Sequence, residues 1–92
     1  MGFKLTYHSD VKKIDLPKID KRNKVIIKRA IEERLTTLPE QYGKPLRGTR
    51  KGYWKLRIGE YRVVFKITGE AVFILGIIHR RDVYKRIMHR VA

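Results

Sequence analysis

The stretch that decides the expected fold is KPLRGTRKGYWKLRIGEYRVVF, residues 44–65. It contains two strand-like runs, Tyr53 to Ile58 and Tyr61 to Ile67 (the second ends just beyond the stretch), joined by Gly59 and Glu60. A two-residue loop that opens with glycine suits a type II′ hairpin turn, whose twist matches the flanking strands. Because side chains alternate between faces along a strand, the hairpin separates an apolar face from a basic face.

The basic face of this hairpin carries an unusual pairing of like charges. Counting from the turn places Arg57 opposite Arg62 and Lys55 opposite Val64. Like charges directly opposite each other destabilise a sheet by roughly 0.2–1 kcal/mol, so a purely structural hairpin gains nothing from the arrangement. A site that holds phosphate would use it, and a solvated basic face is the alternative.

Composition describes a small and strongly basic chain. Its 92 residues include 23 lysines and arginines against 9 aspartates and glutamates, a formal net charge of +14. The size predicts one domain, residues 1–92, and the charge predicts a polyanionic partner such as nucleic acid, an anionic membrane or an acidic protein. Cysteine is absent, which removes thiolate metal sites. The sequence has neither a signal-peptide pattern nor a long apolar stretch. We therefore expect a cytoplasmic protein that has no membrane among its partners.

The remaining segments complete an α+β pattern. Residues 3–8 alternate as a half-buried strand does, and residues 10–14 predict a short helix before Pro17. A longer helix is expected between Asp20 and Pro39, then a loop at 41–52, a strand at 71–79 and a basic helix at 82–91. We therefore predict a small, twisted, mainly antiparallel four-stranded sheet with an N-terminal helical hairpin and a short C-terminal helix.

The strand at residues 71–79, AVFILGIIH, is apolar on both faces, which is typical of a strand covered on both sides. Strict alternation divides it between the two faces. The core face would hold Val72, Ile74, Gly76 and Ile78; the face with Arg62 would hold Phe73, Leu75, Ile77 and His79. Either the C-terminal segment or a partner must then cover the large apolar side chains on the basic face.

This prediction gathers groups that bind phosphate and transfer protons. They are Lys55, Arg57, Arg62 and His79 on the sheet, with Arg80, Arg81 and Tyr84 just after it. No phosphate-binding glycine loop, zinc-ligand spacing or Ser/His/Asp arrangement is present, so neither a metal nor another cofactor is expected. The set suits RNA cleavage, in which a base deprotonates the 2′-hydroxyl, cations stabilise the phosphorane and an acid protonates the leaving oxygen. Taken alone, His79 could equally be an idle strand-end histidine, and Tyr84 is better explained as a packing aromatic.

Three segments carry a resemblance to a known family: LRG at 46–48, YWKLRIGEYRVVFKI at 53–67 and HRRDVY at 79–84. Together they resemble the RelE/ParE superfamily of toxins from type II toxin–antitoxin systems, on the RelE side. The first strand and the helices also fit, so the resemblance covers nearly the whole chain. It implies a ribosome-dependent mRNA endonuclease that contacts mRNA and ribosomal RNA in the 70S A site. It also implies a cognate antitoxin, which the charge of this chain predicts to be acidic.

The resemblance assigns site residues one by one. Lys55, Arg62, Arg80 and Tyr84 match catalytic positions of RelE-type members, the tyrosine at a shorter spacing. RelE has a second lysine where this chain has Tyr53, so the general base is left open between Lys55, His79 and Tyr84. Further RNA-binding candidates are Tyr53, Arg57, Arg47, Arg50, Lys51 and Arg81. ParE-type members share the fold, generally lack this residue set and inhibit DNA gyrase. Gyrase inhibition is therefore the alternative function, and binding of nucleic acid by a basic surface is a third, less specific possibility.

Overall fold

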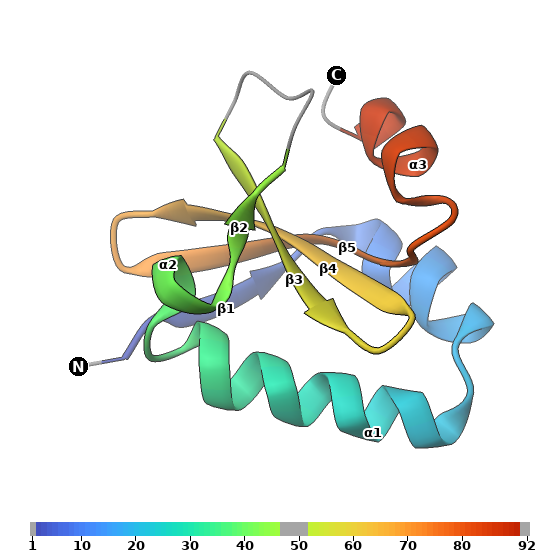
Figure 1. Ribbon diagram of the computed structural model, residues 1–92, viewed down its shortest axis with the longest axis horizontal. Coiled ribbons are helices and arrows are strands. Elements are labelled where there is room, and N and C mark those ends of the chain that lie inside the picture. Colours follow the sequence, from blue (N-terminus) through green and yellow to red (C-terminus); the bar gives the residue numbers. More distant parts are fainter. Residues whose placement is uncertain (1, 47–51, 91–92) are drawn as a thin grey trace.

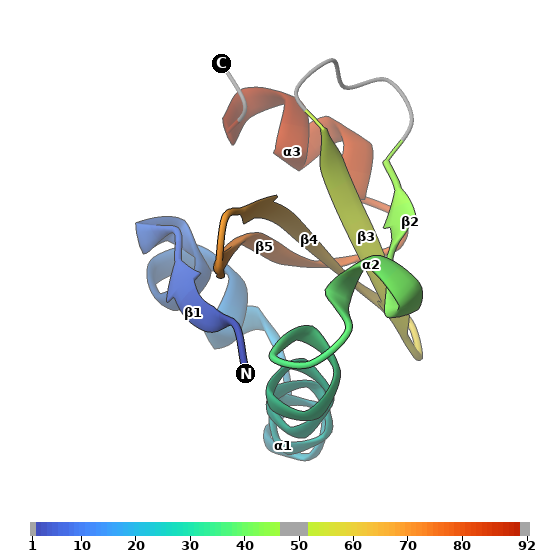
Figure 2. The ribbon, with the colours of Figure 1, turned by 90° about the vertical axis from the view of Figure 1, so that its left-hand side faces the viewer.

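The computed structural model, which describes residues 2–46 and 52–90, places one sheet between helical layers (Figure 1). Helix α1 (Lys21–Ala30) covers one face and α3 (Val83–Arg90) covers the other (Figure 2). The strands are β1 (Lys4–Tyr7), β2 (Lys44–Pro45), β3 (Tyr53–Ile58), β4 (Tyr61–Thr68) and β5 (Ala71–His79). They lie in the order β1-β5-β4-β3-β2, with β1 parallel to β5 and the other neighbours antiparallel. The α+β class and the mainly antiparallel sheet are confirmed.

The sheet has five strands where the sequence predicted four. The additional strand is β2, in the segment predicted as a loop, where Lys44 and Pro45 lie opposite Lys55 and Trp54. It is preceded by the short helix α2 (Pro39–Tyr42). Proline is tolerated in a strand at a sheet edge, because its missing N–H can face away from the neighbouring strand. The glycine and proline spacing that predicted a loop therefore also fits a minimal edge strand.

The register of the central hairpin is as predicted. Arg57 lies opposite Arg62 and Lys55 opposite Val64, and the turn begins at Gly59 with φ of +57°. Glycine adopts this backbone region without steric cost, whereas other residues rarely do. The two-residue turn thus fixes which side chains of β3 and β4 share a face.

The N-terminal helical layer differs from a simple hairpin of two helices. The predicted first helix, residues 10–14, is helical, but it consists of the π-helix η1 (Val11–Asp15) and is followed by the 3₁₀-helix η2 (Leu16–Lys18). Helix α1 begins after Asp20, whose carboxylate accepts a bond from the backbone N–H of Asn23 at 3.2 Å, and it continues into η3 (Ile31–Leu35). A bond from the side-chain amide of Asn23, at 2.6 Å, and then this backbone bond lower the pKa of Asp20. Asp20 is therefore the N-cap that the sequence predicted.

Two apolar clusters pack against the sheet, one on each face. The larger cluster lies between the sheet and α1–η3 and includes Ile27, Ile31, Leu35, Val63 and Phe65. The smaller cluster lies under α3, where Leu75 packs with Val83 and Ile87 while Phe73 contacts its margin. Of the two expected covers for Leu75, the C-terminal segment is therefore the one observed. No helix within the described ranges is long and apolar enough to span a membrane.

A β-bulge in β5 overturns the predicted faces of residues 76–79. Val64 lies opposite Gly76 but Phe65 lies opposite Ile74, so Leu75 is an extra residue in β5. Ile77 consequently joins the cluster under α1 and Ile78 joins the cluster under α3, the reverse of the expectation. His79 follows Ile77 to the α1 side, where its ring meets Tyr61 edge-on with centroids 5.7 Å apart. A one-residue insertion exchanges the two faces of every residue that follows.

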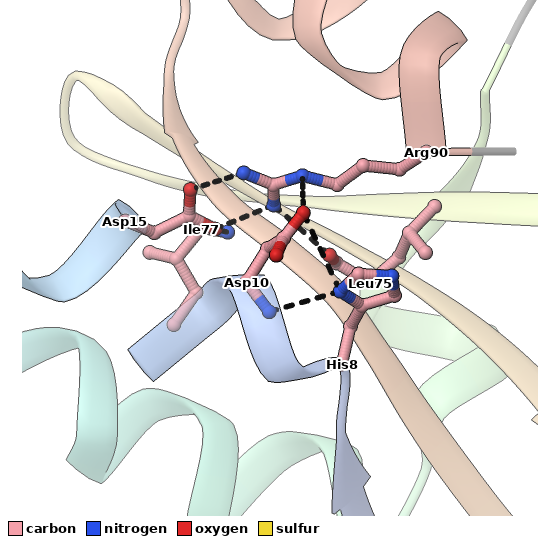
Figure 3. Close-up of polar contacts among 6 residues, drawn as sticks. All are labelled: His8, Asp10, Asp15, Leu75, Ile77 and Arg90. Carbon is pink, nitrogen blue, oxygen red and sulfur yellow. Dashed lines mark hydrogen bonds and ion pairs between the residues drawn. The ribbon is translucent and has the colours of Figure 1, made fainter. Parts of the chain in front are cut away.

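A buried ion pair joins α3 to the N-terminal turn (Figure 3). Arg90 donates two hydrogen bonds to the carboxylate of Asp15, at 2.6 and 2.8 Å, and its Nε lies 3.6 Å from Asp10. The side chains of Asp15 and Arg90 are only 1% and 6% exposed. The hydrogen bonds that Arg90 donates to the Asp15 carboxylate raise the pKa of Arg90 above its ordinary value.

The same pair satisfies backbone groups of β5. Among the described residues, β1 pairs with β5 only as far as Ile74. Beyond this point Asp15 accepts a bond from the N–H of Ile77 at 2.9 Å, and Arg90 donates to the carbonyl of Leu75 at 3.1 Å. Buried backbone groups need such partners, so Asp15 and Arg90 replace a strand neighbour there.

Candidate functional site

A basic cleft of about 370 Å³ lies beside β3, between the central hairpin and the α2–β2 segment. We use the term basic cleft for the hollow lined by Arg34, Tyr42, Lys44, Lys55, Leu56, Arg57 and Arg62. None of these described lining residues is acidic. Cations that share a concave surface without carboxylates attract an anion from outside the protein.

Strand pairing gathers these cations. Lys44 on β2 lies opposite Lys55 on β3, and Arg57 on β3 lies opposite Arg62 on β4. Each pairing of like charges costs roughly 0.2–1 kcal/mol. The sheet therefore carries two unfavourable pairings side by side, which bound phosphate would relieve. Arginine suits this task because its planar guanidinium can donate two parallel bonds to one phosphate.

The guanidinium of Arg62 is held beside the hairpin turn. Its Nη1 donates to the carbonyls of Gly59 at 3.1 Å and Tyr61 at 3.0 Å. The side chain is half-buried and Lys55 is equally intermediate in exposure, whereas Arg57 is exposed. Because the bonds to the turn involve Nη1 alone, Nε and Nη2 are the nitrogens suited to a phosphate in the cleft.

Arg80 lies at the same turn but is paired with an acid. Its backbone N–H donates to the carbonyl of Glu60 at 2.8 Å, and its Nε lies 2.7 Å from the Glu60 carboxylate. Both side chains are about 60% exposed, at 59% and 61%. An ion pair this exposed contributes about 0–1 kcal/mol, so a phosphate could displace Glu60 from Arg80 at little cost.

His79 is not brought together with Lys55 and Arg62. It lies on the α1 side of the sheet, where its Nδ1 accepts bonds from the backbone N–H and the Nε of Arg81, at 3.2 and 3.3 Å. His79 and Arg81 line a second hollow with Lys18 and Arg86, and this hollow shares no described residue with the basic cleft. The predicted single face for Lys55, Arg57, Arg62 and His79 is therefore wrong, because the bulge at Leu75 turns His79 away.

The other predicted residues fall into three places. Tyr84 lies on α3 with 44% of its surface exposed, outside the described lining of the basic cleft. Tyr53 is half-buried beside the cluster under α3, with Lys66 Nζ 5.7 Å from its ring centroid. Arg47, Arg50 and Lys51 lie outside the described residues.

Besides the apolar Leu56, three lining residues were not predicted as site residues from the sequence: Arg34, Tyr42 and Lys44. Arg34 belongs to η3 and Tyr42 to α2, and only the fold brings them to β3. Pro39 and Gly43, which bracket Tyr42, indicated the end of the helix but not that the chain returns to the sheet edge there. Lys44 could have been found only with the expectation that β2 pairs with β3.

A family model described as ParE toxin of type II toxin-antitoxin system, parDE, matches residues 5–84. The chain belongs to this family. The match covers most of the sequence and includes both hairpin strands, β5 and the first residues of α3. The resemblance to the RelE/ParE superfamily is thereby confirmed.

The similar proteins include a toxin and chains of toxin–antitoxin complexes. Toxin RelG of Mycobacterium tuberculosis is 41% identical over 54 residues, which are 56% of this chain and 62% of that protein, so less than two thirds of RelG is spanned. The toxin–antitoxin complex RelBE2 of M. tuberculosis holds a chain with a TM-score of 0.78 and 27% identity, covering 87% of this chain and all of that one. The RelB–RelE complex of Methanococcus jannaschii matches at a TM-score of 0.59 and 22% identity, over 88% and 96% of the two chains, which indicates a shared fold.

Proposed function

We propose that this chain is the toxin of a type II toxin–antitoxin system and that it cleaves mRNA on the ribosome. The observation that carries the proposal is the basic cleft, where Lys55, Arg57 and Arg62 meet with no acidic residue among the described lining. The likeness to RelG and to a chain of the RelBE2 complex supports the RelE type. Family membership alone leaves the chemistry open, because one fold can host several activities.

In the proposed reaction the substrate supplies its own nucleophile. Lys55 accepts the proton of a ribose 2′-hydroxyl, and the 2′-oxygen attacks the adjacent phosphorus. Arg62 and Arg57 bind the phosphorane oxygens, where negative charge develops. The 5′-oxygen then leaves with a proton from an acid, so the products are a 2′,3′-cyclic phosphate and a 5′-hydroxyl. Tyr84 is our candidate for this acid, on the resemblance alone.

Two of the predicted catalytic residues, Arg80 and His79, are not positioned beside Lys55 in the structure as it stands. Arg80 can add charge stabilisation once a phosphate replaces Glu60, its present partner at 2.7 Å. His79 lies on the other side of the sheet from Lys55, beside Tyr61 and Arg81. Its role in proton transfer stays a prediction, and Lys55 is the general base that the cleft favours.

The proposed partners follow from charge and from relatives. With a net charge of +14, the chain would bind the phosphates of mRNA and ribosomal RNA through many contacts. The RelBE2 and RelB–RelE structures contain toxin–antitoxin complexes. We therefore propose a cognate acidic antitoxin that binds this chain in the cytoplasm and neutralises its basic surface.

The deciding experiment compares wild type with Arg62→Ala on programmed ribosomes, mapping new mRNA 5′ ends. Removing one donor to a developing oxyanion typically lowers a rate about 10²–10³-fold, and we expect a loss of that size. Arg22→Ala is the matched control, since it removes the same charge from the exposed first turn of α1. It should retain most of the activity.

The same purified proteins also test the gyrase alternative, which the ParE family match favours. Gyrase-linked DNA breaks without mRNA cleavage would replace the endonuclease proposal. Rapid cutting of free RNA with no gain from ribosomes would reject ribosome dependence. A cooperative thermal melt of Arg62→Ala must accompany the comparison, so that lost activity is not confused with unfolding.

A further inference from the structure

We propose that Tyr42 and Arg34 form a nucleobase-stacking subsite in the basic cleft, which takes single-stranded RNA. One base would stack on the tyrosine–arginine pair while Lys44 binds the neighbouring phosphate. The inference rests on the proposed RNA substrate, and it names how that substrate is positioned. No such platform was evident in the sequence, because Tyr42 lies outside the hairpin strands and only the fold brings it beside Arg34.

Tyr42 is exposed but its backbone is firmly held. Its N–H donates to the carbonyl of Leu38 at 3.2 Å, and the N–H of Gly43 donates to Pro39 at 3.0 Å. A Cβ at position 43 would lie 2.5 Å from the ring of Phe65, which is completely buried, so the backbone here approaches the core more closely than a side chain allows. Tyr42 itself remains 48% exposed. An aromatic ring with a fixed backbone and an open surface can receive a stacking base with little ordering cost.

Arg34 gives this ring a charged neighbour. Its guanidinium carbon lies 5.8 Å from the Tyr42 ring centroid, within the range of a cation–π contact. Arg34 comes from η3, on a different element from Tyr42, so the contact holds the ring relative to the helical layer. Proteins that bind single strands combine aromatic rings, arginine contacts and a cationic groove in this way.

The phosphate-binding half of the subsite is adjacent. Lys44 follows Tyr42 by two residues and lies opposite Lys55 in the β2–β3 pairing. All four residues line the basic cleft. A base on Tyr42 would therefore place its own backbone next to the Lys44 ammonium, in the cleft that the proposed catalytic residues Lys55 and Arg62 also line.

Tyr7 offers a matched control at the other edge of the sheet. It lies on β1 with 47% of its surface exposed, nearly the same as Tyr42, but it lines a different, mainly apolar hollow with Val11 and Ile27. Burial, followed by the nearby Glu32 carboxylate, raises the pKa of Tyr7. Its surroundings thus differ from the basic cleft while the size and exposure of the ring are matched.

The test uses a short 2′-O-methyl oligoribonucleotide with 2-aminopurine at successive positions, because blocking the 2′-oxygen prevents cleavage. Binding is followed by anisotropy at low salt, and stacking by quenching of the 2-aminopurine fluorescence. Loss of one base–aromatic stack should weaken binding about 5- to 150-fold in Tyr42→Ala and abolish the quenching. Tyr42→Phe, which keeps the ring, and Tyr7→Ala should both bind like wild type. Thermal melts establish that each variant is folded.

The proposal is wrong if folded Tyr42→Ala binds like Tyr7→Ala, or if the quenching survives in it. Since the probe cannot be cleaved, this result is independent of catalysis. Tyr42-dependent quenching together with no cleavage of ribosome-bound mRNA would leave the subsite standing and reject the endonuclease. Cleavage of ribosome-bound mRNA by wild type, with unchanged oligonucleotide binding in Tyr42→Ala, would support the endonuclease and reject the stacking subsite.

Discussion

Two groups of cations in this small protein have opposite surroundings. Arg90 is almost fully buried, bonded to Asp15 and a backbone carbonyl and close to Asp10. Arg57 and Arg62 face each other across two strands, next to two lysines and with no acidic residue among the described lining of their cleft. One arginine is neutralised from within the molecule, and the others depend on something outside it.

The difference shows where a basic chain places its few carboxylates. Only 9 residues are acidic against 23 lysines and arginines, so most cations cannot have an internal partner. Asp10 and Asp15 are near Arg90, and Glu60 is near Arg80. A cation that holds the fold receives an acid, because a buried unpaired charge is very costly. The cations of the basic cleft have no acid among its described lining, and this separates the cleft from the buried pair of Asp15 and Arg90.

Breaking the buried pair should have the largest effect. Asp15→Ala leaves Arg90 buried without its main partner, and removing one member of such a pair costs about 3–5 kcal/mol. The free energy of unfolding from urea titration measures this loss. Glu60→Ala removes an exposed partner of Arg80 instead, and there we expect about 0–1 kcal/mol. Equal losses in the two variants would contradict the distinction between buried and exposed pairs.

Crowding the guanidinium of Arg90 should have an intermediate effect. A Cβ at Gly76 would lie 2.8 Å from Arg90 Nη1 and 3.1 Å from the Ile87 side chain. Gly76→Ala therefore overpacks the site under α3, at an expected cost of about 1–3 kcal/mol. Chemical shifts of the Arg90 side chain should move in the folded variant. An unchanged melting temperature together with unmoved Arg90 chemical shifts would contradict this crowding.

Placing an acid in the cleft should have the smallest effect on stability, and the opposite sign. Arg57→Glu replaces a like-charge pair with an opposite-charge pair across from Arg62, which should stabilise the fold by roughly 0.2–1 kcal/mol. The same variant should bind ribosomes more weakly in sedimentation, because the cleft now repels phosphate. A variant that is less stable than wild type would indicate that Arg57 has a structural role we have not identified.

The sequence predicted the parts of the fold that are specified locally. Gly59 fixed the hairpin turn, so the pairing of Arg57 with Arg62 followed by counting, and Asp20 marked the start of α1. The bulge at Leu75 could not be predicted, because all residues from 71 to 78 are small or apolar and either alternation satisfies them. That single unmarked insertion moved His79 out of the predicted site.

The candidate site was half predictable for a related reason. Lys55, Arg57 and Arg62 belong to the hairpin, whereas Arg34, Tyr42 and Lys44 reach the cleft through tertiary packing that no local pattern specifies. The pairing of Asp15 with Arg90 could not be predicted either, since the local sequence around each residue gives no indication of the other. Local sequence patterns do not predict contacts between residues that are distant along the chain.

The ion pair between Asp15 and Arg90 also affects how the protein folds during its synthesis. These residues are 75 positions apart, and β1 pairs in parallel with β5. Neither contact can form during synthesis until the chain has been translated through residues 71–90, although the β3–β4 hairpin can form earlier. Contacts of such long range slow folding, because the intervening chain must be closed before they contribute. In a nascent chain, the basic hairpin would therefore be formed for some time before α3 packs against the sheet.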